Sequence, residues 1–367
     1  MKFICSRDRL VEIVSIVQKA VSTRSTLPIL DGILIHASEN SVRLTGYDLE
    51  TGIEALMDSD VSSEGEIVIN SRLFGDIIRK LPDENVLLES NEQNQVTIES
   101  GSSVFSIKGF SAEGYPKIPI VTDDQKISLS QGVLKEMIRQ TNFAVSTDES
   151  RPTLNGCLFS SDGFAVEMVA IDGFRLAIRK RLIGTDLPVV KYIIPGKTLS
   201  EVGRILSAKD EEVVIYSSSN HILFDIGNVR IVSRLIQGEY MNYKSILPSS
   251  ANTTLVVSPQ AMLEALERAS LIILSEDRRS PVQFTMPIDD TLVISAQTEV
   301  GTLREEISVS ITGERIDIDF NPRYFIDALR VIEKEEISII FNGSVGPCVI
   351  KPTEGDDFSY LVLPLRR

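Results

Sequence analysis

The sequence contains no tryptophan, only two histidines and only three cysteines among its 367 residues. Cys5, Cys157 and Cys348 lie far apart and none belongs to a CxxC pair, so the chain encodes neither a disulfide framework nor a cysteine zinc site. We expect all three to be small buried hydrophobic residues. His36 and His221 each stand in an alternating, strand-like stretch, which favours a position on a strand surface over metal binding or acid–base catalysis.

Long apolar runs are also absent. No run approaches the roughly 18–20 residues needed to cross a bilayer, and charged Arg7 and Asp8 come too early for a signal peptide. Hydrophobic residues make up 43% and charged residues 24% of the chain, which is the profile of a soluble globular protein. We therefore expect a cytoplasmic protein with a sizeable core.

The signatures of common enzyme sites are missing as well. The chain has no GxxxxGK[ST] loop, no GxGxxG after a strand, no HExxH and no GxSxG. The best local candidate is Asp172 with Arg175, joined by Asp48, as an acid–base or phosphate-handling cluster. Asp172-Gly173 is more simply a turn between two strands. We predict a non-catalytic protein without catalytic residues, metal or cofactor.

A repeated unit runs through the whole chain. Each unit has a short strand, a capping residue, an apolar-periodic helix and then alternating stretches separated by turns. An apolar residue early in each helix recurs every 61 to 65 positions, at Leu10, Leu73, Leu134, Leu199, Leu263 and Phe325. The expected helix caps are Ser6, Ser130, Ser258 and Asn321, and Pro259 and Pro322 suit the first helical position.

Strand-length runs fill the space between these helices. They include Ile33–His36, Val42–Thr45, Val86–Glu89, Val96–Glu99, Val213–Tyr216, Ile222–Ile226 and Leu292–Ala296. Hairpin signals separate such runs at Ser38–Ser41, Asp162-Gly163, Asp289-Asp290 and Asn342-Gly343. Each unit is thus one helix with three or four strands, and the short turns indicate antiparallel sheets.

A unit of about 62 residues buries too little surface to be stable by itself, so we expect the units to pair. This predicts an α+β protein of three repeated domains, each with two helix-plus-antiparallel-sheet units. Polar segments at 122–125 and 248–252 suggest the boundaries. The predicted domains are residues 1–122, 126–247 and 253–367.

The charge is distributed unevenly. The net charge of −15 speaks against a conventional nucleic-acid binder, which needs a basic surface for phosphate contacts. The six helix windows, however, carry 14 Lys and Arg against 9 Asp and Glu, so a net charge of −20 lies in the remainder. Helices that face DNA from inside a ring would show this segregation, and ordinary amphipathic helices with solvated polar faces would show it equally.

Several motifs resemble the family of bacterial DNA sliding clamps, the β subunits of DNA polymerase III, in order and with matching spacing. They are the MKF start, Thr26–Gly32, Leu44–Glu50, Leu154–Gly156, Ala170–Ala177 and Tyr360–Arg366. The resemblance implies three clamp domains per subunit and a head-to-tail homodimer. Helices would line the ring and sheets would form its outside. The implied function is a topological tether, independent of DNA sequence, that confers processivity on a polymerase.

The resemblance also implies a pocket for short, largely apolar linear motifs of partner proteins, which include the polymerase catalytic subunit, the clamp loader and repair polymerases. The matching positions are Leu154, Ile171, Gly173, Phe174, Arg175, Leu176, Met241, Ile246, Val362, Leu363, Pro364, Leu365 and Arg366. Arg175 would pair with backbone or carboxylate groups at the rim. Many members have other residues at Phe174, Met241 and Ser245, so the motif preference is expected to differ here. Core packing is the simpler alternative for Leu154, Ile171 and Leu176.

For DNA, the resemblance points to Arg24, Arg72, Arg151 and Lys197, and for the dimer interface to Phe105, Ile107, Ile273 and Leu274. The alternative to a clamp is a repeat-built adaptor that binds peptides without encircling DNA. Positive charge concentrated on the helices favours the clamp.

Overall fold

The structure is a computed structural model that describes residues 1–22, 27–121, 125–184, 186–248, 251–273, 281–287 and 290–365. The chain forms two compact units, and each combines two segments. Unit 1 is Met1–Gly132 with Glu201–Leu235, and unit 2 is Val133–Ser200 with Ile236–Arg367. The division falls inside helices α3 (Gln131–Thr141) and α4 (Gly196–Ile205). Each unit has its own sheets and its own hydrophobic cluster.

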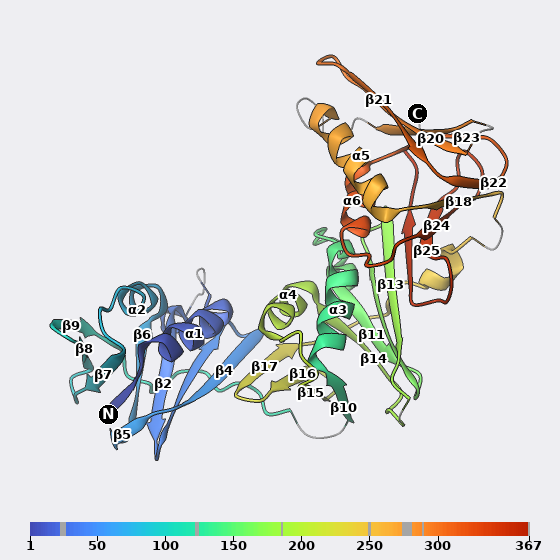
Figure 1. The fold of residues 1–367 in the computed structure, drawn as a ribbon. Coiled ribbons are helices and arrows are strands. Elements are labelled where there is room, and N and C mark those ends of the chain that lie inside the picture. The colour runs from blue at the N-terminus through green and yellow to red at the C-terminus, as the bar shows by residue number, and fades with distance from the viewer. Residues whose placement is uncertain are drawn as a thin grey trace. The chain divides into compact units, whose positions relative to one another are not determined.

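Unit 1 contains two antiparallel sheets (Figure 1). The eight-stranded sheet has the order β10 (Gln125–Ser130), β15 (Glu212–Ser217), β16 (His221–Ile226), β17 (Val229–Arg234), β4 (Thr51–Asp58), β3 (Ser41–Tyr47), β2 (Gly32–Ser38) and β6 (Gly65–Asn70). The five-stranded sheet has the order β5 (Asp60–Ser63), β1 (Lys2–Ser6), β7 (Asn85–Ser90), β8 (Gln95–Ser100) and β9 (Ser103–Lys108). Helices α1 (Arg7–Val17) and α2 (Ser71–Ile78) contact each other, and α1 packs on β3 and β4.

Unit 2 repeats this plan (Figure 1). The nine-stranded sheet has the order β14 (Val190–Pro195), β11 (Gly156–Ser161), β12 (Ala165–Ile171), β13 (Arg175–Leu182), β26 (Phe358–Val362), β25 (Cys348–Pro352), β24 (Ile337–Phe341), β18 (Thr253–Val257) and β22 (Ser310–Gly313). The four-stranded sheet has the order β21 (Thr302–Ser308), β20 (Thr291–Gln297), β19 (Val282–Met286) and β23 (Ile316–Phe320). Helices α5 (Pro259–Ile273) and α6 (Pro322–Leu329) pack side by side.

All six predicted helices and all seven predicted strands are present, which confirms the α+β class and the repeat. Two of the predicted caps are wrong. The Ser6 side chain makes no capping bond, because Ser6 belongs to β1 and the Arg7 N–H donates to the Glu84 carbonyl at 2.7 Å. At α3 the Gln131 N–H donates to the Glu211 carbonyl, and the Ser130 hydroxyl donates to Asp210 instead. In both cases a neighbouring loop supplies the acceptor that the serine was expected to provide.

The other expected starts are confirmed. Asn321 accepts from the Arg323 N–H, Ser258 accepts from the Ala261 N–H, and Pro259 and Pro322 occupy the first helical positions. Cys5, Cys157 and Cys348 are free and buried, as predicted. His36 and His221 lie on strands β2 and β16.

Each of the two large sheets joins strands from two of the predicted domains. In unit 1, β4 of the first predicted domain pairs with β17 of the second, and we call this pairing the first junction. In unit 2, β13 of the second predicted domain pairs with β26 of the third, and we call this the second junction. The predicted domain limits at 122–125 and 248–252 stay predictions. Strands of neighbouring predicted domains pair in one sheet, so the contacts do not separate these domains.

Within the described ranges, none of the helices is both long enough and apolar enough to span a bilayer. The same described ranges contain no group of three or more His, Cys, Asp or Glu side chains that could hold a metal ion.

Candidate functional site

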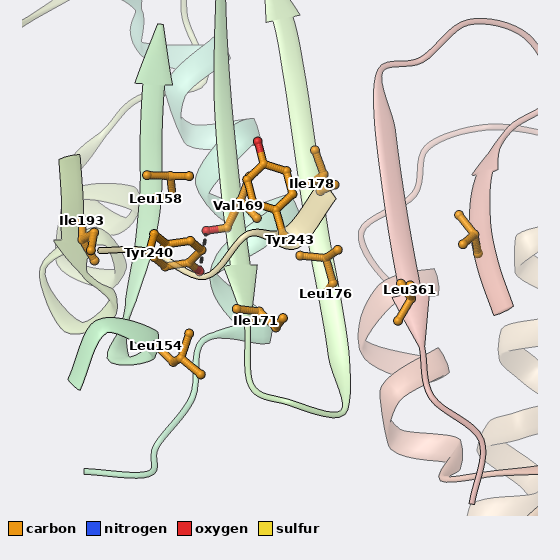
Figure 2. Packing of buried hydrophobic residues seen from close by; sticks show 11 residues of the cluster. Leu154, Leu158, Val169, Ile171, Leu176, Ile178, Ile193, Tyr240, Tyr243 and Leu361 are labelled. Atoms are coloured by element: carbon orange, nitrogen blue, oxygen red, sulfur yellow. Dashed lines mark hydrogen bonds between the residues drawn. The ribbon is translucent and has the colours of Figure 1, made fainter. Parts of the chain in front are cut away.

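The second junction is built on a hydrophobic cluster that covers the sheet face of β11, β12 and β13. The segment after β17 lies over this face, and the Tyr240 hydroxyl donates to the carbonyls of Gly156 and Val169 at 3.4 and 3.1 Å (Figure 2). The Tyr243 hydroxyl donates to the Glu167 carboxylate. These bonds anchor a loop whose apolar side chains complete the cluster.

The predicted pocket residues divide into a floor and a rim. Leu154, Ile171 and Leu176 are almost fully buried in the cluster and form the floor. Val362 is equally buried, but it pairs with Arg175 while Leu361 pairs with Leu176, so its side chain lies on the opposite face of the sheet. The rim is exposed, with Phe174 at 56%, Met241 at 45%, Leu363 at 37% and Leu365 at 36%. Gly173, also exposed, and the partly buried Ile246 and Pro364 complete the described members, and Arg366 lies outside the described residues. A burial difference of this kind is what a preformed apolar site needs, because the floor fixes the shape and the rim can contact a ligand.

Arg175 makes several contacts within the protein. Its Nε donates to Asp172 at 3.0 Å, its Nη1 to Asp327 at 2.6 Å and its Nη2 to the Phe143 carbonyl at 2.6 Å. Its guanidinium also lies 4.9 Å from the centre of the Tyr324 ring. Each of the three guanidinium nitrogens therefore makes a bond inside the protein, and the side chain ties α6 to the start of β13. The pairing of Arg175 with groups at the pocket rim stays a prediction.

The aspartates considered for catalysis hold turns. One oxygen of Asp172 accepts from the N–H groups of Phe174 and Arg175, and Gly173 between them has a φ of +96°. Asp48 does the same in unit 1, where it accepts from Glu50 and Thr51. Asp48 and Asp172 are thus equivalent residues of two repeats, and the turn expected at Asp172-Gly173 is present.

Two of the cavities in unit 2 include residues predicted for the pocket. The first, of about 540 Å³, is lined by Met241 together with Tyr240, Tyr243 and polar residues of β11 to β14. The second, of about 580 Å³, is lined by Pro364 and Leu365 together with Asp317, Asp319 and Val345. Surface hollows therefore flank the rim residues of the C-terminal tail and of the loop at Met241.

The described residues that are predicted for DNA belong to different elements of the chain. Arg24 lies outside the described residues, and Arg72 and Lys197 are exposed on α2 and α4. Arg151 pairs with Asp148 at 3.0 Å, and its Nη1 lies 3.0 Å from where a Cβ on Gly173 would stand. Arg151 therefore lies against the turn that carries Phe174, beside the predicted pocket.

Of the residues predicted for the dimer interface, two lie on an edge strand and one lies on a helix. Phe105 and Ile107 belong to β9, the edge strand of the five-stranded sheet. Ile273 is only 1% exposed at the end of α5, so it packs inside the subunit, whereas Leu271 of the same helix is 74% exposed. Leu274 lies outside the described residues. The strand β21, which contacts α5, forms an edge of the four-stranded sheet.

Sequence reasoning missed the residues that hold this site together, namely Phe143, Tyr240, Tyr243, Tyr324 and Asp327. A signal for one of them was present. Tyr115 donates to the carbonyls of Gly32 and Thr45, as Tyr240 does to those of Gly156 and Val169. A comparison of the repeats after their last strands would have revealed these two tyrosines.

Comparison with known proteins identifies the family. Three family models match in order: the N-terminal domain of the DNA polymerase III beta subunit at residues 1–119, its central domain at 128–242 and its C-terminal domain at 244–366. The beta sliding clamps of Staphylococcus epidermidis and Staphylococcus aureus are 38% and 37% identical over 375 residues, which cover 100% of this chain and 99% of theirs.

A solved structure agrees with this result. The DNA polymerase sliding clamp of Bacillus subtilis matches with a TM-score of 0.95 and 36% identity, over 100% of this chain and 99% of that one. The relatives are named for a clamp and not for a catalytic activity, in line with the non-catalytic role predicted from the sequence. The chain belongs to the family of DNA polymerase III beta subunits, the bacterial sliding clamps.

Proposed function

We propose that two copies of this chain close head to tail into a ring around duplex DNA, and that the ring tethers a polymerase. DNA, a polymerase and a second copy of the chain are the partners that membership of the family implies. The peptide-binding adaptor without DNA is not favoured, because the similarity to sliding clamps covers the full chain. Such a clamp acts where the bacterial chromosome lies, so a cytoplasmic location is part of the proposal.

The observation that carries the ring is a junction made twice within the chain. At the first junction the Arg234 N–H donates to the Glu50 carbonyl, and at the second the Leu363 N–H donates to the Phe174 carbonyl, both at 2.9 Å. The partners match in register as well, with Ile53 opposite Ile231 and Ala177 opposite Tyr360.

Two edge strands of the chain each correspond to one strand of this junction and lack the other. Strand β21 forms a hairpin with β20, as β4 does with β3 and β13 does with β12. Strand β9 forms a hairpin with β8, as β17 does with β16. Neither β21 nor β9 has a second neighbour among the described residues. A repeated head-to-tail contact that closes gives a ring, so a second copy can supply the missing strand on each side.

The register of this third junction follows from the first two. Leu303 stands where Ile53 and Ala177 stand in their strands, and Phe105 stands where Ile231 and Tyr360 stand. Leu303 should therefore face Phe105 of the second copy. Phe105 is 36% exposed in the single chain, whereas Ile53, Ile231 and Tyr360 are buried at the completed junctions. Pairing would bury it in the same way.

DNA contact is proposed for the helices, with Arg72 and Lys197 as the placed candidates and Arg24 as a further one. Weak attraction from sparse cations holds the duplex without fixing its position, which suits sliding. Arg151 is better assigned to the client pocket, because it lies against Gly173 and pairs with Asp148.

Client proteins, among them the polymerase catalytic subunit, the clamp loader and repair polymerases, are proposed to bind the second junction through short apolar motifs. The buried floor of Leu154, Ile171 and Leu176 beside the exposed Phe174, Met241 and Leu363 supports this. Deleting residues 363–367 should abolish binding of polymerase-derived peptides and leave the dimer intact. Unchanged peptide affinity would place the client site elsewhere.

The ring itself is tested on nicked circular DNA after loading. We expect the clamp to be retained on the circle and to escape after the circle is cut once, because a topological link has no other exit. Equal retention on circular and linear DNA would refute encirclement.

A further inference from the structure

The cavity of about 540 Å³ is distinct from the proposed client pocket, and Met241 of the pocket rim is the one described residue that belongs to both sets. It is lined by residues of β11 to β14 and of the loop that carries Tyr240 and Tyr243. Figure 2 shows the Tyr240 ring between Leu158 on one side and Leu154 and Ile171 on the other. Leu158 lines the cavity, whereas Leu154 and Ile171 belong to the pocket floor. The two hollows are therefore neighbours across this loop.

Most acidic groups of the cavity already have partners. Glu167 accepts from the Tyr243 hydroxyl. Asp162 accepts from the N–H groups of Ala165 and Phe164, which lower the pKa of its carboxyl, and it lies 3.9 Å from Lys180. These carboxylates are committed to the loop and to the β11–β12 turn, so they are poorly placed to neutralise a further cation.

Two lysines in the cavity lack such a partner. Across the described residues, no carboxylate oxygen is recorded within 4 Å of the Lys191 or the Lys244 ammonium group, and the Lys244 Nζ lies 5.9 Å from the centre of the Tyr243 ring. Glu239 is the one acidic lining residue for which no bond is recorded within the same ranges. The uncommitted groups are thus two cations and one anion, in a chain whose net charge is −15.

Apolar side chains continue from the cavity in both directions. Val189, 78% exposed, lines its far side, and Met241, 45% exposed, lines the side toward the client pocket. An extended peptide that crosses Met241 would keep apolar contact while its polar side chains reach Lys191 and Lys244.

We propose that this cavity binds an acidic flank of client segments, next to the apolar anchors in the second-junction pocket. The inference rests on the proposed client function of that pocket and adds a charge preference to it. Aspartate or glutamate side chains of the flank pair with Lys191 and Lys244, while Met241 and Val189 contact the aliphatic parts of the flank. Because both lysines are exposed, each pair contributes modestly, and together they should strengthen binding about five- to tenfold.

The test uses isothermal titration calorimetry of the full-length clamp with the clamp-binding segment of the organism's own replicative polymerase. The segment is made with three glutamates, three glutamines or three lysines added at either end, because the direction of the chain across Met241 is open. We expect the glutamate flank at one end to bind about five- to tenfold more tightly than the glutamine flank at low salt. This gain should shrink at high salt, because screening weakens exposed pairs.

The double variant Lys191→Glu/Lys244→Glu should lose the gain while it binds the glutamine-flanked segment as the wild type does. The matched control is Lys126→Glu, a surface lysine of β10 outside the cavity, which should retain the gain. Thermal unfolding checks that each variant is folded. Equal affinity for glutamate and glutamine flanks in the wild type, or a gain that survives in the double variant, overturns the acidic-flank proposal and leaves the client pocket standing. Failure of every segment to bind the wild type overturns both.

Discussion

The first and second junctions share their backbone geometry and differ in the side chains that cover it. At the first, Ile118 lies over Gly52, and its Cδ1 is 2.5 Å from where a Cβ on Gly52 would stand. At the second, Leu176 occupies the position of Gly52, and Tyr243 follows Tyr240 at the spacing by which Ile118 follows Tyr115. Identical strand pairing can therefore serve ring closure at every junction, while the covering side chains decide which junction can accept a client.

The junctions also differ in buried charge. Arg179 of β13 is 4% exposed and contacts Glu136 at 3.0 Å and Asp357 at 3.8 Å. The matching residue of β4 is Ala55, which is buried opposite Val229. The second junction thus contains polar contacts from β13 to α3 and to Asp357, the residue before β26. The matching position of the first junction is apolar.

The largest effect is expected for Arg179→Leu. The substitution leaves Glu136 and Asp357 without their buried partner, and we expect a loss of about 3 kcal/mol in the free energy of unfolding, because both carboxylates remain partly open to water. Chemical denaturation measures it. A variant as stable as the wild type would show that the buried cation does not hold the second junction.

A smaller loss, about 2 kcal/mol, is expected for Arg175→Ala, because bonds to Asp172, Asp327 and the Phe143 carbonyl disappear together. Arg234→Ala at the first junction is the control, since its pair with Glu50 is 3.5 Å long and both side chains are about two-thirds exposed. That control should change stability by less than about 0.5 kcal/mol. Equal losses for the two variants would contradict the role assigned to Arg175.

Gly52→Leu tests whether Ile118 fills the first junction. Crowding against Ile118 should cost about 1–2 kcal/mol of unfolding free energy. In the double variant Gly52→Leu/Ile118→Ala the shortened side chain makes room, so we expect part of this loss to return. A double-mutant cycle by chemical denaturation should give a coupling above about 0.5 kcal/mol. Additive losses would mean that the two side chains do not compete for the same space.

The smallest effect is expected for the native cysteines, which should not react at all in the folded protein at pH 8. Burial raises the pKa of the Cys5 and Cys157 thiols to about 12 and that of Cys348 as well. Their reactive thiolate forms only as the pH approaches these values, so at pH 8 about one thiol in ten thousand is ionised. Mass spectrometry after iodoacetamide treatment should find modification in urea and none in buffer. Rapid modification in buffer would contradict the burial of these residues.

The sequence predicted the elements well and the site only in part. The helices at Leu263 and Phe325 follow from apolar spacing and local caps, which are properties of neighbouring residues. Motifs in the sequence pointed to Leu154 and Ile171, which lie in the floor of the proposed client pocket. The contacts of Arg175 could not be predicted in this way, because Asp327 lies 152 residues away and only folding brings α6 beside the β12–β13 turn.

Burial was equally hard to foresee at the interface. By sequence, Ile273 fits an apolar contact between subunits. In the structure its side chain lies on the buried face of α5, whereas the side chain of Leu271, two positions earlier, is exposed. Two residues along a helix lie on different faces, so a short apolar run cannot say which member meets solvent. Strand pairing gives the information that a short apolar run does not contain. The register of the first and second junctions predicts which residues pair at the proposed third junction.

The most direct test of the account is a disulfide between subunits at the third junction. Leu303 and Phe105 should form a non-hydrogen-bonded antiparallel pair with Cα atoms about 4.5 Å apart, close enough for a disulfide. The double variant Phe105→Cys/Leu303→Cys, oxidised at pH 8 and run on a non-reducing gel, is predicted to give a covalently closed dimer in high yield. The register control Ser106→Cys/Leu303→Cys places its thiols on opposite faces and should give little. Absence of the closed dimer in the first variant, or equal cross-linking in both, would contradict a ring that closes by repeating its own internal junction.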